Sequence, residues 1–298
     1  MADAISWELY RSFLAVARNG SLSGAARALR LTQPTIGRHI DQLEQALGLP
    51  IFTRSPQGLL PTDTALALVP LAEAMESAAE AMARVASGPT DELSGAVRIT
   101  ASEIVGAEVL PPILAAFAEH HPKIAFELHL SNLTEDLLHR SADIAVRMTR
   151  PTQTGLVARK LGATVIGVYA HRRYLEGRPA PQTPSHLADL RVIGFDRDRT
   201  AVKAMGEAGI PLTRETFSLL TDSHLAQLAA LRAGYGVGVC QVGIARRDPD
   251  LIRLLPESFA VPLDTWLVMH EDLRSSLRVR SLFDHLAAGL TAYLATSR

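Results

Sequence analysis

Residues 21–47 read SLSGAARALRLTQPTIGRHIDQLEQAL and contain two helix starts with a short turn between them. Ser21 and Thr32 are residue types that cap helix N-termini, and apolar residues follow each of them at helical spacing. In the second segment Ile36 and Ile40 begin an apolar stripe, which leaves a polar face on the N-terminal half of that helix. Two helices joined by a short turn, the second with an exposed polar face, are typical of a helix-turn-helix.

The flanking residues extend this motif to a winged head. An amphipathic helix from Tyr10 precedes it and ends at Asn19-Gly20, and residues 49–62 follow as two short strands around Ser55-Pro-Gln-Gly58. A recognition helix enters the major groove with its N-terminal residues on base edges, and a wing reaches the backbone or the minor groove. The alternative for the polar face is a solvated surface. We expect DNA contacts from Ser21, Thr32, Gln33, Pro34, Thr35, Arg38, His39 and Arg54.

Residues 63–88 are predicted to form a long linker helix. Thr62 is a suitable N-cap, Ser87-Gly88-Pro89 ends the pattern, and Pro70 is expected to bend the helix. Apolar residues recur at the alternating spacing of a coiled-coil seam. They are Leu68, Leu71, Met75, Ala78, Met82 and Val85. The seam favours dimerisation, and packing of the helix on its own domain is the alternative.

From Gly95 onward, strand and helix patterns alternate, which predicts an α/β fold with a mainly parallel sheet covered on both faces. Strands are expected at residues 97–101, 124–130, 143–147, 164–170, 192–195, 217–220, 237–240 and 265–270. Helices are expected at residues 102–120, 133–139, 222–233 and 276–294. This length of α/β pattern favours two small lobes.

Composition limits the function classes. The 298 residues are 47% hydrophobic and 20% charged, with a net charge of −1, which excludes a disordered chain, a collagen-like fold and a coat-like nucleic-acid binder. Residues 1–62 carry six arginines against four acidic residues, a local charge of +2 that suits a small DNA-binding module. A single cysteine, Cys240, indicates a reducing compartment, and no signal peptide or membrane-length apolar run is apparent. We expect a soluble cytoplasmic protein with no membrane partner.

Three motifs in the head carry a family resemblance. They are Ala25-Ala26-x-x-Leu29, Thr32-Gln-Pro-Thr-Ile36, and Ile40-x-x-Leu43-Glu44-x-x-Leu47-Gly48-x-x-Ile51-Phe52-x-Arg54. With these motifs the whole chain resembles the LysR-type transcriptional regulators. The match in the second half is looser and rests mainly on residues 110–117, 121–122, 142–147 and 233–238. Two departures are Gly37, where the family usually has a serine that contacts phosphate, and Pro61-Thr62-Asp63-Thr64-Ala65, which replaces Leu-Thr-x-Ala-Gly.

The resemblance implies a domain plan. It consists of a winged helix-turn-helix at 1–62, a linker and dimerisation helix at 63–88, and an effector domain at 93–298 that resembles periplasmic solute-binding proteins. One lobe would contain residues 93–161 and 270–298, and the other residues 162–269. The function implied is a sequence-specific transcription regulator controlled by a small molecule between the lobes. Its partners would be double-stranded DNA with a pseudo-palindromic site and further copies of the chain, which would form a dimer through the linker helix and then a tetramer. RNA polymerase is a further candidate partner.

Strand ends and helix starts give the candidate effector residues. They are Ser102, Ser131, Asn132, Met148, Thr149, Phe195, Thr221, Asp222 and Ser223. For Ser102 and Asp222 the alternative is helix capping. Glu103 would oppose an acidic effector unless Arg147 compensates, so the effector is not named. No cofactor is expected.

Rival classes have weaker support. The sequence has no Gly-x-Ser-x-Gly elbow and no phosphate-binding loop, and its Gly234-x-Gly236-x-Gly238 cluster precedes a strand, so we expect neither an enzyme nor a nucleotide site. His120-His121 lacks partners at metal-ligand spacing. Cys240 has apolar neighbours and is expected to be a buried small residue, with a redox-sensing thiol as the alternative. A solute-binding protein without a DNA role and a protein-docking scaffold are the remaining rivals; the salt dependence of DNA binding separates them.

Overall fold

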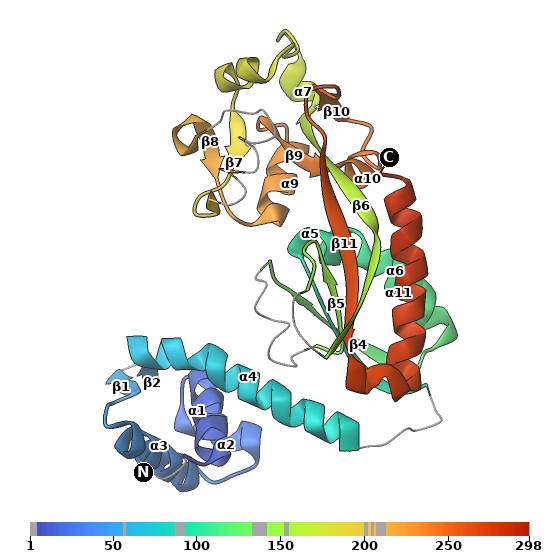
Figure 1. Ribbon diagram of the computed structural model, residues 1–298. Coiled ribbons are helices and arrows are strands. Elements are labelled where there is room, and N and C mark those ends of the chain that lie inside the picture. The colour runs from blue at the N-terminus through green and yellow to red at the C-terminus, as the bar shows by residue number, and fades with distance from the viewer. Residues whose placement is uncertain are drawn as a thin grey trace. The chain divides into compact units, whose positions relative to one another are not determined.

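The structure is a computed structural model that describes residues 5–55, 58–86, 93–132, 142–151, 155–199, 202–203, 206 and 213–297 (Figure 1). The described residues form two compact units, one ending at Ala86 and the other beginning at Leu93. Among these residues, no helix has the length and apolar character needed to cross a membrane.

The first unit is a helical head followed by a two-stranded wing and a long helix. Its elements are α1 (Trp7–Asn19), α2 (Leu22–Leu29), α3 (Gln33–Leu47), β1 (Phe52–Ser55), β2 (Gly58–Pro61) and α4 (Asp63–Ala86). Ser21 accepts a hydrogen bond from the backbone N–H of Gly24, and Thr32 accepts one from that of Thr35. Both predicted N-caps are therefore confirmed.

The core of the head includes the apolar stripe of α3 that the sequence predicts, together with residues of α1, α2 and the start of the wing. Phe13, Ala25, Ile36, Leu43 and Ile51 are fully buried there, and Ile40 is 6% exposed. The wing packs beside the turn between α1 and α2, where the N–H of Leu59 donates to the carbonyl of Gly20 at 2.9 Å. The sequence prediction of a winged helix-turn-helix agrees with this arrangement.

Helix α4 uses two different faces. Thr62 caps it by accepting from the N–H of Ala65 at 3.2 Å, and Pro70 lies inside the helix. Ala65 and Ala72 are buried against the head, and Arg18 of α1 pairs with Glu76 at 2.8 Å. The first half of α4 therefore packs on its own domain, which was the alternative considered for the whole helix.

The second unit is built on one mixed sheet. Its strands are β3 (Gly95–Ala101), β4 (Ile124–Leu130), β5 (Ile144–Arg147), β6 (Leu156–His171), β7 (Val192–Gly194), β8 (Phe217–Leu220), β9 (Val237–Gln241), β10 (Leu251–Leu254) and β11 (Val261–His270). In the described residues the order is β4-β3-β5-β11-β6-β9-β7-β8, and β10 also pairs with β6.

The prediction of a mainly parallel sheet is wrong. The pairs β3–β4, β3–β5, β7–β8 and β7–β9 are parallel, whereas β6 and β11 pair with each other and with β5, β9 and β10 in antiparallel fashion. The two long strands run through both halves of the sheet in opposite directions, as Figure 1 shows. A register shift occurs near Gly162, whose φ of 147° favours glycine.

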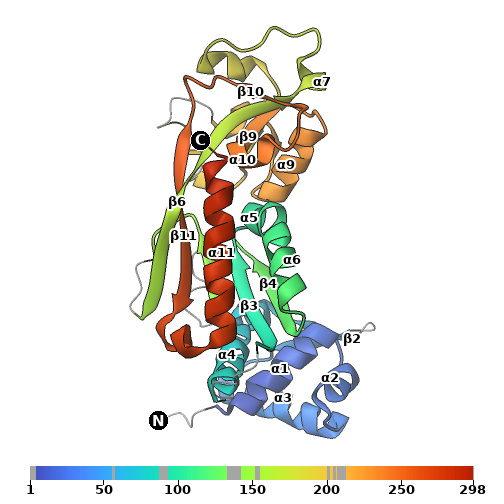
Figure 2. The same cartoon turned by 90° about the vertical axis from the view of Figure 1, so that its right-hand side faces the viewer.

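Helices pack against strands in both halves of this sheet. They are α5 (Glu103–Glu108), α6 (Leu110–His120), α7 (Arg172–Leu175), α9 (His224–Arg232), α10 (Val242–Ala245) and α11 (Leu277–Ala295), with 3-10 turns η2 (Pro184–Asp189), η3 (Arg214–Thr216) and η4 (Glu271–Ser275). Figure 2 shows α11 along β6 and β11. The helix predicted at 133–139 lies outside the described residues.

The helix predicted over residues 102–120 is two helices. The helix is interrupted at Val109, which lies between α5 and α6. Two prolines, Pro111 and Pro112, stand in the first turn of α6. Proline lacks a backbone N–H and is tolerated in the first turn, so it favours a new helix start over continuation of the old one. The short α5 that results stands between β3 and α6, and it carries Glu103 at one end and Glu108 at the other.

Candidate DNA-binding face and effector site

The N-terminal face of α3 gathers most of the predicted DNA contacts. Thr32, Gln33, Pro34 and Arg38 are exposed, and Thr35 is half-buried beside them. The Thr32 and Thr35 hydroxyls lie 2.8 Å apart. Because the opposite side of the helix is buried, this polar face points away from the core and is available to a large ligand.

Two tertiary contacts hold side chains on or beside this face. The Oγ of Ser23 donates to the Oε1 of Gln33 at 3.1 Å, which links α2 to the start of α3. The Nδ1 of His39 lies 2.7 Å from the Oγ of Ser12, a residue with no exposed surface. Half-buried His39 is thus anchored to α1 below it.

Ser21 and Arg54 stand apart from this group. The Ser21 hydroxyl caps α2, so its first role in the fold is to hold that helix start. Arg54 lies in β1 opposite Leu59 of β2, and its side chain is outside the described residues. The structure therefore gathers the α3 residues into one face and places Arg54 in the wing strand.

Glu44 holds the wing against α3, a role that the sequence analysis did not single out. Its Oε1 accepts the backbone N–H of Ile51 at 2.8 Å and that of Phe52 at 3.2 Å. One carboxylate at the end of α3 therefore fixes the start of the wing relative to that helix. Glu44 belongs to the motif quoted from the sequence, but only the fold brings it to the N–H groups it holds.

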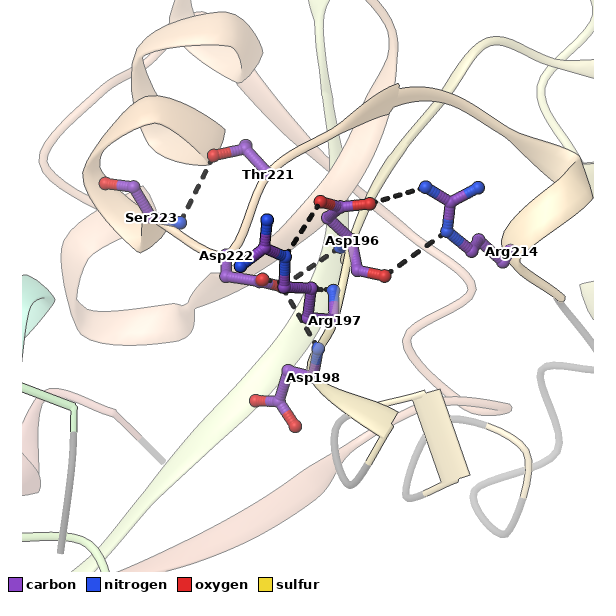
Figure 3. Close-up of polar contacts among 7 residues, drawn as sticks. All are labelled: Asp196, Arg197, Asp198, Arg214, Thr221, Asp222 and Ser223. Carbon is purple, nitrogen blue, oxygen red and sulfur yellow. Dashed lines mark hydrogen bonds and ion pairs between the residues drawn. The ribbon is translucent and has the colours of Figure 1, made fainter. Parts of the chain in front are cut away.

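In the second unit, Asp222 is enclosed by backbone N–H groups (Figure 3). Its carboxylate accepts from the N–H groups of Asp196, Arg197 and Asp198 at 2.9 to 3.2 Å. Desolvation raises the pKa of Asp222, but these hydrogen bonds outweigh it and hold the pKa below its usual value. The carboxylate stabilises the loop after β7 instead of capping the first turn of α9.

The neighbouring residues at the ends of β7 and β8 are also bonded within the fold. Buried Gln227 donates its amide to the carbonyls of Gly194 and Thr221, at 3.2 and 2.8 Å. Thr221 accepts the N–H of Ser223, and the buried ring of Phe195 meets the ring of His224 edge-on at 6.1 Å. Phe195, Thr221, Asp222 and Ser223 therefore lie together, and Gln227 is a support that sequence reasoning missed.

Three predicted effector residues come from the ends of β3 and β4. Ser102 precedes α5 without capping it, and its hydroxyl is buried with no hydrogen-bond partner among the described residues. The backbone N–H of Ser131 donates to the carbonyl of Ala101. Asn132 accepts the N–H of Glu103 at 3.1 Å, so it takes the capping position that Ser102 leaves.

Glu103 itself reaches from α5 to α9. Its Oε2 accepts from the Oγ of Ser223 at 3.1 Å and from the N–H of His224 at 3.0 Å. A carboxylate at this N-terminus is favoured by the helix dipole and by the exposed N–H groups there. Glu103 therefore links Ser223 to Asn132, which accepts the Glu103 N–H, and to Ser102, its neighbour in the chain; Ser102 and Asn132 come from the other half of the sheet.

Met148 and Thr149 follow β5 near the long strands. The Sδ of Met148 accepts the hydroxyl of Thr265 in β11 at 3.6 Å, and Thr149 is exposed. The structure therefore places Met148 beside the point at which β11 changes register, and among the described residues no hydrogen bond links Met148 or Thr149 to Thr221, Asp222 or Ser223.

Cys240 is buried in β9, and burial raises the pKa of its thiol to about 12. A thiol in this state is poorly nucleophilic, so a redox-sensing role has no support here. Across the described ranges, no group of histidine, cysteine and carboxylate side chains is arranged to hold a metal.

Two family models match the chain. The model for the bacterial regulatory helix-turn-helix protein of the lysR family covers residues 7–66, and that for the LysR substrate binding domain covers residues 90–291. The chain belongs to the LysR family. Its members are transcription regulators and not enzymes, so this chain is a regulator that binds DNA and responds to a small-molecule effector.

Curated relatives and solved structures agree with this assignment. The chain is 26% identical over 294 residues to the probable HTH-type transcriptional regulator LtrA of Klebsiella pneumoniae, which covers 96% of this chain and 95% of that protein. It is 32% identical over 236 residues to the activator AmpR of Rhodobacter capsulatus, with 75% and 76% covered. Full-length CbnR in complex with its target DNA has a TM-score of 0.64 at 19% identity, with 95% and 99% covered, and at this identity the likeness concerns the fold.

Proposed function

We propose that this LysR-family regulator recognises DNA through the exposed N-terminal face of α3. The proposal rests on the exposed polar side chains at the capped start of α3, among them Thr32, Gln33 and Arg38. Ile36 and Ile40 of the same helix are buried in the core of the head. Arg38 suits a guanine edge or a phosphate, and Gln33 suits adenine. Ser21, Pro34, Thr35, His39 and Arg54 complete the proposed set.

The proposed regulator is a dimer of this chain that pairs into a tetramer. On α4, Leu71, Met75 and Met82 are 57%, 40% and 65% exposed, although they are large apolar side chains at seam spacing. A second copy of α4 would cover them. Two heads related by a two-fold axis would read a pseudo-palindrome, with recognition helices about one DNA turn or a multiple of it apart. Tetramer formation would use the second unit.

The effector site is proposed between the two halves of the second unit, which we assign as residues 93–161 with 270–298 and residues 162–269. Support comes from the residues at strand ends that the fold brings near one another, notably Ser102, Asn132 and Ser223. Ser131, Met148, Thr149, Phe195, Thr221 and Asp222 complete the proposed set. We place the protein's action in the cytoplasm, and RNA polymerase is a proposed further partner.

Selection of bound DNA from random fragments by the purified full-length chain tests this function, at two salt concentrations. The expected result is a two-fold-symmetric motif whose affinity falls steeply at the higher salt, because phosphate contacts release counterions. Arg38→Ala serves as the matched variant and should lose most of the enrichment. A folded wild-type chain that enriches no motif at either salt, with and without a metabolite extract as effector source, would contradict the proposed DNA contacts.

A further inference from the structure

Helix α5 is joined to α9 at both of its ends. At its start, the Glu103 carboxylate accepts from the Ser223 hydroxyl and the His224 N–H. At its end, Glu108 receives a bidentate hydrogen bond from Arg232, with Nη1–Oε1 and Nη2–Oε2 distances of 2.7 and 2.9 Å. The two contacts connect segments about 120 positions apart in the chain (121 and 124 for His224 and Arg232).

These contacts cross from one half of the sheet to the other. Helix α5 follows β3, which pairs with β4 and β5, whereas α9 lies between β8 and β9. Only the long strands β6 and β11 pair across both halves among the described strands. A set of bonds between α5 and α9 therefore ties two halves that the sheet itself joins through two strands.

The Glu108 end is the stronger attachment. Arg232 also lies 3.8 Å from Asp248, and Arg247 donates to the backbone carbonyl of Glu108 at 2.6 Å. The hydrogen bonds from Arg232 lower the pKa of Glu108 against the opposing effect of partial burial. Bidentate pairing of a guanidinium with a carboxylate is geometrically specific and stronger than a single ion pair.

Beneath the polar contacts the helices share apolar packing. Four side chains that are each under 5% exposed belong to one cluster: Val105 in α5, Val109 directly after it, and Leu228 and Leu231 in α9. This packing and the Glu108 pair fix the far end of α5. At the other end of α5, the Glu103 carboxylate accepts from a hydroxyl and a first-turn N–H of α9 and not from a bidentate guanidinium.

We propose that α5 is a clasp between the two lobes of the effector domain, in which Glu108 is the fixed end and Glu103 the end that releases. The Glu103 carboxylate is the acceptor for two donors at the start of α9, the Ser223 hydroxyl and the His224 N–H. Release of that carboxylate frees Ser223 and the His224 N–H and lets the lobes move relative to each other. That this motion alters the DNA-bound state rests on the proposed function; the clasp itself does not.

The test uses the full chain and a readout at the contact itself. Amide hydrogen exchange at His224 should quicken by more than tenfold in Glu103→Ala, because Glu103 is the acceptor of that N–H. Glu103→Gln keeps the side-chain shape and should give a smaller increase. Glu257→Ala changes an exposed glutamate of the same unit and should leave the exchange unchanged.

Lobe movement is measured by spin-label distances. Labels at Ala116→Cys on α6 and Ile252→Cys on β10 use exposed positions in regular elements, and buried Cys240 does not compete for the label. Glu103→Ala should broaden or shift the distance distribution, and Glu108→Gln combined with it should do so further. Wild-type exchange and an unchanged distribution in Glu103→Ala would overturn the clasp; if that variant does not fold, the same two results in Glu103→Gln would do so.

The link to DNA is tested separately. On a selected operator without effector, Glu103→Ala should give a footprint or bend angle different from that of the wild type. An unchanged footprint with a broadened distance distribution would overturn the coupling and leave the clasp intact. A wild-type chain that selects no operator would contradict the proposed function, and the exchange and distance results would still decide the clasp.

Discussion

The Nδ1 of His39 lies 2.7 Å from the Oγ of Ser12, so a ring on the recognition helix is anchored to a hydroxyl buried in α1. The contact sets the position of the imidazole before DNA is present. It also means that a substitution in the core of the head reaches the DNA-binding face through one hydrogen bond.

Ser12→Ala should lower the free energy of unfolding by about 1 kcal/mol, because a buried hydrogen bond is lost. It should also weaken operator binding, to a degree close to that of His39→Ala, since both changes remove the anchored ring from its position. Chemical denaturation and DNA titration of the two single variants and the double variant give the comparison. Normal DNA affinity in His39→Ala would remove His39 from the proposed contacts, and normal affinity in Ser12→Ala alone would show that the ring does not need its anchor.

Arg38→Ala should weaken operator binding by about 1–3 kcal/mol without loss of stability, because the side chain is exposed. Titrations at several salt concentrations distinguish its partner. A phosphate contact predicts a salt slope smaller by about one, and a guanine contact predicts relaxed sequence preference at one position. The matched control is Arg11→Ala on α1, an exposed arginine paired with Glu8 outside the proposed face. Equal losses in the two variants would contradict the assignment.

Gly37→Ser should strengthen DNA binding. A Cβ at Gly37 would meet only the Leu22 Cδ1 at 3.7 Å, an ordinary contact distance, so the helix accepts a side chain there. The hydroxyl would add the phosphate contact that the family resemblance implies at this position. Gly37→Ala is the control, since it gains helix propensity without a hydroxyl. If the alanine and serine variants bind DNA equally, the gain comes from helix stability alone.

Leu71→Glu and Met82→Glu should each shift the chain toward monomers, because they place a charge in the exposed apolar seam of α4. Sedimentation across a concentration series measures the effect. Leu66→Glu is the matched control: it is 56% exposed on the same helix but lies on a different side from the seam. An unchanged association state in both seam variants would refute dimerisation through α4.

Asp222→Asn should destabilise the second unit by about 1–2 kcal/mol near neutral pH, since a charged acceptor of three N–H groups is lost. The pKa of Asp222 is lowered in the folded state, so its contribution is present above its unfolded value of 3.8 and disappears as the pH falls through the folded value. The wild-type and variant stabilities should therefore converge in acid. Asp189→Asn, at an exposed position, is the control. A pH-independent difference would mean that the charge of Asp222 does not stabilise the loop.

Local patterns in the sequence were sufficient for the head. Ser21, Thr32 and Thr62 act within a few residues of themselves, and the Ile36 stripe follows from helical periodicity, so each could be read without knowledge of the fold. The helix break at Val109 has a local signal in Pro111 and Pro112, although the sequence analysis predicts one helix over residues 102–120. The register of β6 against β11, which makes the sheet mixed, had no local signal.

The winged head, the linker helix, the α/β character of the second unit and the family can all be predicted from local patterns and motifs in the chain. Which polar residues contact one another depends on how the elements pack. Glu44 with Ile51, Asp222 with residues 196–198, and Glu103 with His224 are hydrogen bonds between separate elements. A carboxylate has the same helical or loop propensity whatever its distant partner is. Its role depends on which N–H groups the packed elements bring within 3 Å or so of it, and no local spacing encodes that distance.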